Sequence, residues 1–142
     1  MKRRSIILIA IVMLFIAGGF AIFYISRPVS DIRTSSPDIE ITAKDLVRFF
    51  EENEQEANEK FVNKIILVKG KVLEISTDST KASSVFLDSG NLLSAVACSF
   101  YPEEYGKVIK LQPGEEVEIK GVCTGKLADV ILNRCSITEN SF

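Results

Sequence analysis

The fold is decided by the stretch Ile65-Ile66-Leu67-Val68-Lys69-Gly70-Lys71-Val72-Leu73-Glu74-Ile75. β-Branched residues fill it, and such residues favour strands. Gly70 stands in its middle, and a glycine inside a strand marks a bulge or a sharp bend. A bend of this kind lets one strand serve both halves of a small barrel. We therefore expect a long, curved strand around which the domain closes.

Four shorter segments with strand-like alternation follow. They cover residues 84–87, 92–100, 117–123 and 128–137, and turn-forming residues separate them at 88–91, 112–115 and 125–126. Residues 76–83 form a polar loop, and residues 102–111 form a short connection with room for one helical turn. Five strands with a break between the third and fourth are the layout of an OB-fold barrel. Another small barrel or a sandwich is the alternative.

One amphipathic helix precedes the strands. Thr42 is a suitable N-cap and Asp45 follows three residues later, as in a capping box. One apolar stripe follows at helical spacing, and we expect the helix to end near Lys60. The stripe comprises Leu46, Phe49, Phe50, Ala57 and Phe61. Five glutamates occupy the other faces, which we expect to be exposed to solvent. The alternative is that this acidic face is a docking surface for a partner. The fold class expected is mainly β, with an N-terminal transmembrane helix and one α-helix packed on a five-stranded OB-fold barrel.

The N-terminal run Ile6–Ile25 contains twenty residues without a charge. At about 1.5 Å per residue it spans about 30 Å, one bilayer hydrocarbon core. Lys2, Arg3 and Arg4 precede it, so the positive-inside rule keeps the N-terminus in the cytoplasm. The alternatives are a cleaved signal peptide, which normally has a shorter apolar region and a small-residue cleavage site, and a buried core helix.

These patterns divide the chain into four segments. Residues 1–26 form the basic end and the anchor, 27–41 a linker, 42–138 the helix plus OB-fold domain, and 139–142 a tail. We expect a single-pass protein of the cytoplasmic (inner) membrane whose C-terminal domain lies in the periplasm or outside the cell. The chain has 142 residues, and fewer than 120 follow Ser26. That length suffices for one small domain.

Charge argues against polyanionic ligands. Three of the 17 Lys and Arg residues precede the apolar run and none of the 19 Asp and Glu does, so residues 27–142 carry a formal charge of −5. Nucleic-acid-binding domains are normally basic, because phosphate neutralisation supplies their affinity. Phe86 and Phe100 fall in register with apolar neighbours, so we expect them in the core rather than as stacking platforms. A protein or peptide partner is favoured, and single-strand or tRNA-like nucleic acid is the alternative.

Catalysis has little support. The sequence contains no His, and its three Cys residues are far apart. The Cys residues do not have the spacing of a zinc site or of a redox motif, and the sequence contains no phosphate-binding glycine loop. We expect no enzyme activity, no cofactor and no metal.

Ligands of OB folds usually meet the second and third strands and the neighbouring loops. On this chain that surface contains Lys81, Ser83, Ser84, Asn91 and Lys126 as candidate ligand-binding residues. For each of them, a solvated loop position without a partner is the alternative.

The third and fifth strands of an OB barrel run side by side and roughly parallel. Cys98 lies six residues after Leu92 and Cys135 seven residues after Ala128, so the two fall at similar heights. A disulfide between Cys98 and Cys135 is therefore expected in an oxidising compartment. Three reduced, buried thiols are one alternative, because free Cys packs as a small hydrophobe, and the other pairings of the three Cys residues are another.

The ordered set of motifs resembles the tRNA_anti-like family of bacterial envelope proteins. It runs from Asn53-Glu54 through Val68-x-Gly70-x-Val72 to Gly121-x-Cys123-x-Gly125 and Cys135-x-Ile137. The resemblance covers residues 42–138, and it implies a membrane-tethered or lipid-anchored OB module without an assigned function. Unlike the lipoprotein members, this chain has a transmembrane anchor and no Cys directly after the apolar run to accept a lipid.

Overall fold

A computed structural model gives the structure of the chain and describes residues 2–25 and 31–138. The chain divides into two units, Met1–Ser30 and Asp31–Phe142. The first contains helix α1 (Lys2–Ile25), as the apolar run predicts. Its segment Ser5–Ile22 is long and apolar enough to cross a membrane, and none of that segment is buried. The predicted tail, residues 139–142, lies outside the described residues.

Strand β2 (Ile65–Thr77) curves through both halves of a closed barrel, as predicted. Its residues 65–71 pair antiparallel with β5 (Glu116–Lys126), and residues 72–77 pair antiparallel with β3 (Ser83–Asn91). A Cβ at Gly70 would lie 3.0 Å from the Cβ of Ala43, so the glycine also lets the first helix of the domain approach.

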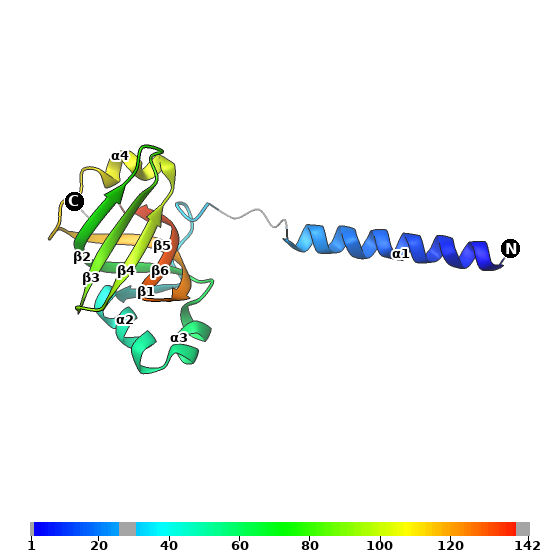
Figure 1. Ribbon diagram of the computed structural model, residues 1–142, viewed down its shortest axis with the longest axis horizontal. Coiled ribbons are helices and arrows are strands. Elements are labelled where there is room, and N and C mark those ends of the chain that lie inside the picture. Colours follow the sequence, from blue (N-terminus) through cyan, green and yellow to red (C-terminus); the bar gives the residue numbers. More distant parts are fainter. Residues whose placement is uncertain (1, 26–30, 139–142) are drawn as a thin grey trace. The chain divides into compact units, whose positions relative to one another are not determined.

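The barrel closes in the order β2-β3-β4-β6-β5, with β5 returning to β2. Strands β4 (Ser94–Phe100) and β6 (Val130–Ile137) pair in parallel, which confirms the predicted neighbourhood of the third and fifth OB strands. The mainly β, five-stranded OB-type barrel is thus confirmed (Figure 1).

The predicted linker over residues 27–41 extends too far into the domain. Ile39–Thr42 form strand β1, which pairs parallel to β2 through Ile39↔Ile66 to Thr42↔Lys69. Ile32 is 2% exposed, so the chain is already packed on the domain seven residues before β1. β1 has four residues, and this is too short for its alternation to stand out between two prolines and a helix cap. Residues 26–30 lie outside the described residues.

The predicted single helix is two helices, α2 (Ala43–Glu52) and α3 (Glu54–Phe61). Thr42 caps α2 as predicted, its Oγ1 accepting from the Asp45 N–H at 3.1 Å. Asn53 interrupts the helix because its Oδ1 accepts from the Glu56 N–H at 3.2 Å and so caps a second start.

Helices close both ends of the barrel (Figure 1). At one end α2 buries Leu46 and Phe50 and α3 buries Phe61 in the core. At the other end the short helices η1 (Pro102–Glu104) and α4 (Tyr105–Val108) lead into buried Val108 and Leu111. The stripe predicted for the helix is therefore structural, because it seals the barrel.

Two chain reversals differ from the prediction. Gly90 (φ 75°) and Gly125 (φ 119°) mark irregularities within strands β3 and β5 rather than the turns themselves. The chain reverses later, at Leu92 and Leu93 between paired Asn91 and Ser94, and at residues 127–129 after Lys126. A glycine bulge displaces each turn, and leucines occupy the two tips.

Candidate functional site

The five predicted ligand residues do not form one site. Lys81, Ser83 and Ser84 lie at the start of β3, where Ser84 pairs with Ser99 at the far end of β4. Asn91 and Lys126 lie at the opposite end of the barrel, because Asn91 pairs with Ser94 and Lys126 with Val130. The prediction therefore grouped residues that lie at opposite ends of the barrel.

These residues also differ in their exposure to solvent and in their hydrogen bonds. Ser83 is 4% exposed and its hydroxyl has no hydrogen-bond partner, whereas Lys81 is exposed with φ 66° in the loop before it. The Asn91 side chain is fully engaged, with Nδ2 donating to the Glu51 carboxylate and Oδ1 accepting from the Leu93 N–H at 2.9 Å. Asn91 thus joins α2 to the β3–β4 hairpin.

The outer face of β3 and β4, where OB folds usually bind ligands, has little charge. Phe86 points outward beside Ala97, between the buried residues Val85 and Leu87, so its predicted place in the core is wrong; Phe100, at 8% exposed, is in the core as predicted. Strands β3 and β4 contain one acid, Asp88, and no Lys or Arg. This face offers an aromatic side chain without cations to hold phosphates.

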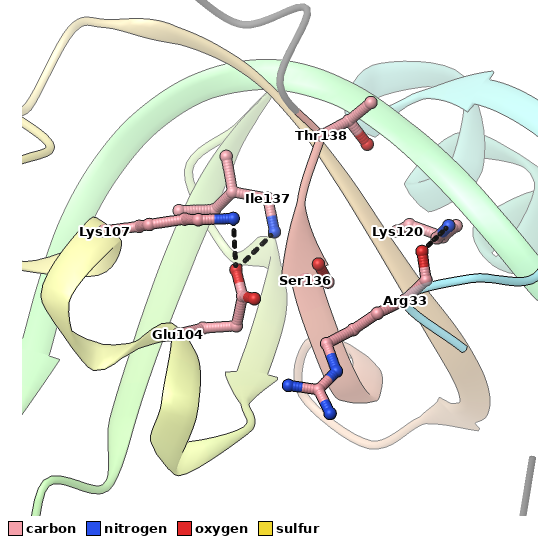
Figure 2. Close-up of a pocket in the computed structure, with 7 residues that line it drawn as sticks. All are labelled: Arg33, Glu104, Lys107, Lys120, Ser136, Ile137 and Thr138. Carbon is pink, nitrogen blue, oxygen red and sulfur yellow. Dashed lines mark hydrogen bonds and ion pairs between the residues drawn. The ribbon is translucent and has the colours of Figure 1, made fainter. Parts of the chain in front are cut away.

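A pocket of about 380 Å³ lies beside the end of β6 (Figure 2). It is lined by Arg33, Glu104, Lys107, Lys120, Ser136, Ile137 and Thr138. Glu104 is 4% exposed, and its Oε2 accepts from the Ile137 N–H at 3.2 Å and lies 3.7 Å from the Lys107 Nζ. The buried carboxylate thereby satisfies the backbone of β6 beyond the last pairing with β4.

The other cations of this pocket are also engaged. Lys120 Nζ donates to the carbonyl oxygens of Arg33 at 3.0 Å and Ser35 at 2.7 Å, which holds the segment before β1 on the barrel. Arg33 binds both carboxylate oxygens of Asp31 and lies 5.2 Å from the centre of the Tyr101 ring. Hydrogen bonds from the Arg33 side chain and backbone lower the pKa of Asp31. The charged residues of this pocket therefore mainly hold the segment before β1 and the end of β6 in place.

Three leucines are almost fully exposed at the tips of two hairpins. Leu92 is 102% exposed, Leu93 87% and Leu127 82%. The tips are adjacent, since the Ser94 Oγ donates to the Ala128 carbonyl at 2.8 Å and the Ala95 N–H to the Asp129 Oδ1 at 2.7 Å. We call Leu92, Leu93 and Leu127 the leucine tips. Clusters of exposed apolar residues are typical of interaction surfaces. The sequence does not predict this cluster, because a glycine bulge displaces each turn.

The remaining chemistry is sparse. Cys98, Cys123 and Cys135 are buried thiols without a disulfide in the structure. Among residues 2–25 and 31–138, no group of three or more His, Cys, Asp or Glu residues is placed to hold a metal ion.

The family model of the tRNA_anti-like proteins matches residues 1–137, which adds the N-terminal helix to the expected 42–138. The chain belongs to the tRNA_anti-like family. No curated protein matches this tRNA_anti-like chain.

Solved structures share the fold of this tRNA_anti-like protein. A candidate nucleic acid-binding lipoprotein from Klebsiella pneumoniae is 17% identical with a TM-score of 0.60, and the match covers 80% of this chain and 100% of that one. A candidate aspartyl-tRNA synthetase from Leishmania major is 13% identical with a TM-score of 0.50, covering 72% of this chain and 21% of the synthetase. At these identities the comparisons establish the fold alone.

Proposed function

We propose that the protein is a membrane-tethered, non-catalytic OB-fold binding module whose partner is a protein or peptide. The leucine tips carry this proposal, because three leucines on adjacent hairpins are 82% exposed or more. Covering one leucine side chain yields about 1.5–3 kcal/mol, so the three together supply a useful share of a binding free energy. Asn91 and Lys126 flank the tips and belong to the proposed interface, whereas Lys81, Ser83 and Ser84 do not.

In this proposal α1 stays uncleaved in the cytoplasmic membrane with its N-terminus inside. Support comes from the basic residues Lys2, Arg3 and Arg4 and from the bulky side chains where a signal peptide has small ones. The domain is then displayed on the outer side. Protease added to intact spheroplasts is expected to digest the domain, and protection of the domain from that protease would contradict this orientation.

The partner is tested by capture from envelope extract with the full-length chain in detergent. Leu92→Ser with Leu127→Ser is expected to lower the yield of a captured protein at least tenfold, because the apolar contacts are lost. Ile109→Ser is the matched control, since Ile109 is also exposed (53%) but follows α4 at the opposite end of the barrel. Equal capture by all three chains would contradict the proposal.

Nucleic acid is the second candidate, and the outward Phe86 is the observation that favours it, because OB folds stack bases on aromatic side chains. Against it stand the absence of Lys and Arg from β3 and β4 and the charge of −5 over residues 27–142. Titration with a single-stranded oligonucleotide at two salt concentrations separates the candidates. Tight binding that weakens steeply with salt and requires Phe86 would favour nucleic acid.

A further inference from the structure

We propose that the leucine tips and the neighbouring acidic faces of α2 and α3 together bind a cationic amphipathic segment of another protein. This inference rests on the proposed function and specifies the chemistry of its partner. The proposed surface consists of Leu92, Leu93 and Leu127 together with the exposed glutamates Glu54 and Glu59 of α3, and we call it the acidic leucine end.

The two helices flank the two hairpins. The Asn91 Nδ2 donates to the Glu51 carboxylate and so fixes the end of α2 beside the β3–β4 tip. A Cβ at Gly125 would lie 3.6 Å from the Asn58 Oδ1, which places α3 beside the β5–β6 hairpin. The leucines are therefore exposed next to helices rather than at an isolated loop.

The helices give this end a negative charge. Residues 43–61 contain six Asp and Glu residues and three Lys and Arg residues, and the charge stays negative when Lys126 beside the tips is added. Two of the cations are engaged within the helices, since an Arg48 Nη lies 2.9 Å from the Asp45 carboxylate and the Lys60 Nζ lies 4.4 Å from the centre of the Phe49 ring. Within the described residues, the exposed carboxylates of Glu54 and Glu59 make no hydrogen bond or ion pair.

Exposed leucines together with exposed glutamates determine which kind of partner fits this surface. A partner must offer apolar side chains to the leucines and positive charge to the glutamates, and a basic amphipathic helix has an apolar face flanked by cations. A second copy of this chain would bring two acidic surfaces together across a symmetric contact, which is unfavourable. An anionic lipid surface would likewise be repelled by the glutamates.

The experiment measures binding of a labelled helical peptide of about 18 Leu and Lys residues, with its leucines on one face, to the full-length chain in nanodiscs of phosphatidylcholine. Binding to empty nanodiscs is subtracted. Leu92→Ser with Leu127→Ser is expected to weaken binding at least tenfold, and Glu54→Gln with Glu59→Gln about threefold with a shallower salt dependence. Glu103→Gln with Ile109→Ser, at the other end of the barrel, should leave binding unchanged.

Three results would overturn the inference: equal binding of a peptide with Glu in place of Lys, no effect of the leucine substitutions, or peptide binding that appears only when the nanodiscs contain phosphatidylglycerol. Failure here is distinct from failure of the proposed function. If the leucine variants lose the captured envelope protein while the anionic peptide binds as well as the cationic one, the protein-binding function stands and the partner's charge is wrong.

Discussion

Gly121 of β5 lies against Cys135 of β6 so closely that a Cβ on the glycine would be 2.6 Å from the Cys135 Sγ. Both residues are buried, and Leu132 crowds the same position at 3.2 Å. The contact requires a residue without a side chain in the middle of a strand, although glycine weakens strands elsewhere.

Gly121→Ala is therefore expected to lower the free energy of unfolding by about 1–3 kcal/mol, the usual cost of overpacking a core. Urea denaturation of the full-length chain in detergent measures it. Gly106→Ala is the control, because a Cβ there meets nothing within 4 Å. Adding Cys135→Ala should recover part of the loss, and purely additive effects of the two substitutions would contradict the contact.

Cys98 and Cys135, the pair predicted to form a disulfide, are free thiols in the structure, and both face the core. Cys98 pairs with Leu132 and Phe100 with Cys135, so two residues of β6, Asn133 and Arg134, lie opposite Ser99 alone. The extra residue forms a bulge with Arg134 at φ 54°, and it turns Cys135 to the same side as Leu132. Burial and a hydrogen bond with the Cys98 thiol raise the pKa of Cys135 well above its ordinary value.

We predict that refolding the full-length chain with oxidised glutathione joins these two residues. Each protein thiol loses its hydrogen, and glutathione disulfide is reduced to two thiols. Peptide mapping should give one Cys98–Cys135 link and an alkylated Cys123, and reduction should cost about 3–4 kcal/mol of stability. Alkylation of Cys98 and Cys135 after oxidative refolding would contradict the prediction.

Arg33 controls the ionisation of Asp31 in the segment before β1. Because hydrogen bonds from Arg33 lower the pKa of Asp31, the ionised carboxylate stabilises the fold above its ordinary pKa, and this contribution disappears as pH falls through the lowered value. Arg33→Gln should raise the Asp31 midpoint in a carbon-detected NMR titration. Arg134→Gln, a remote substitution, serves as control. An Asp31 midpoint unchanged by Arg33→Gln would refute this account.

Asn53 begins α3 with its side chain. Asn53→Ala removes the bond from the Glu56 N–H and is expected to cost about 1 kcal/mol of stability. Gln55→Ala, two residues into α3, should change stability by less than about 0.5 kcal/mol. Thermal unfolding compares the two, and an Asn53→Ala variant as stable as Gln55→Ala would show that the cap does not stabilise the break between the helices.

Much of the fold followed from local patterns. Three features were predictable from the sequence: the bend at the glycine of β2, the Thr42 cap, and the parallel third and fifth OB strands. Hydrophobic periodicity, helix capping and barrel topology each have a strong physical signal. The break at Asn53 was not predicted, although Asn53 and Glu56 carry a second capping signal inside the apolar stripe. β1 was missed because it is stabilised by pairing with β2 rather than by its own four residues.

The proposed binding surface was harder to predict from the sequence than the fold. Gly90 and Gly125 indicated turns, but each lies in a bulge, and the chain reverses at the leucines that follow. A leucine in a strand period is assigned to the core until the register is known. The candidates Ser83 and Lys126 were placed by analogy with other OB folds, and the barrel separates them.

The central claim is that a protein covers the leucine tips. The most direct measurement is photo-crosslinking in living cells from a photoreactive residue at position 92 of the full-length chain, compared with position 109 at the opposite end. We predict a crosslinked protein from position 92 that is absent from position 109 and lost with Leu127→Ser. Equal crosslinking from both positions, or crosslinks from position 92 to lipid or nucleic acid alone, would contradict the account.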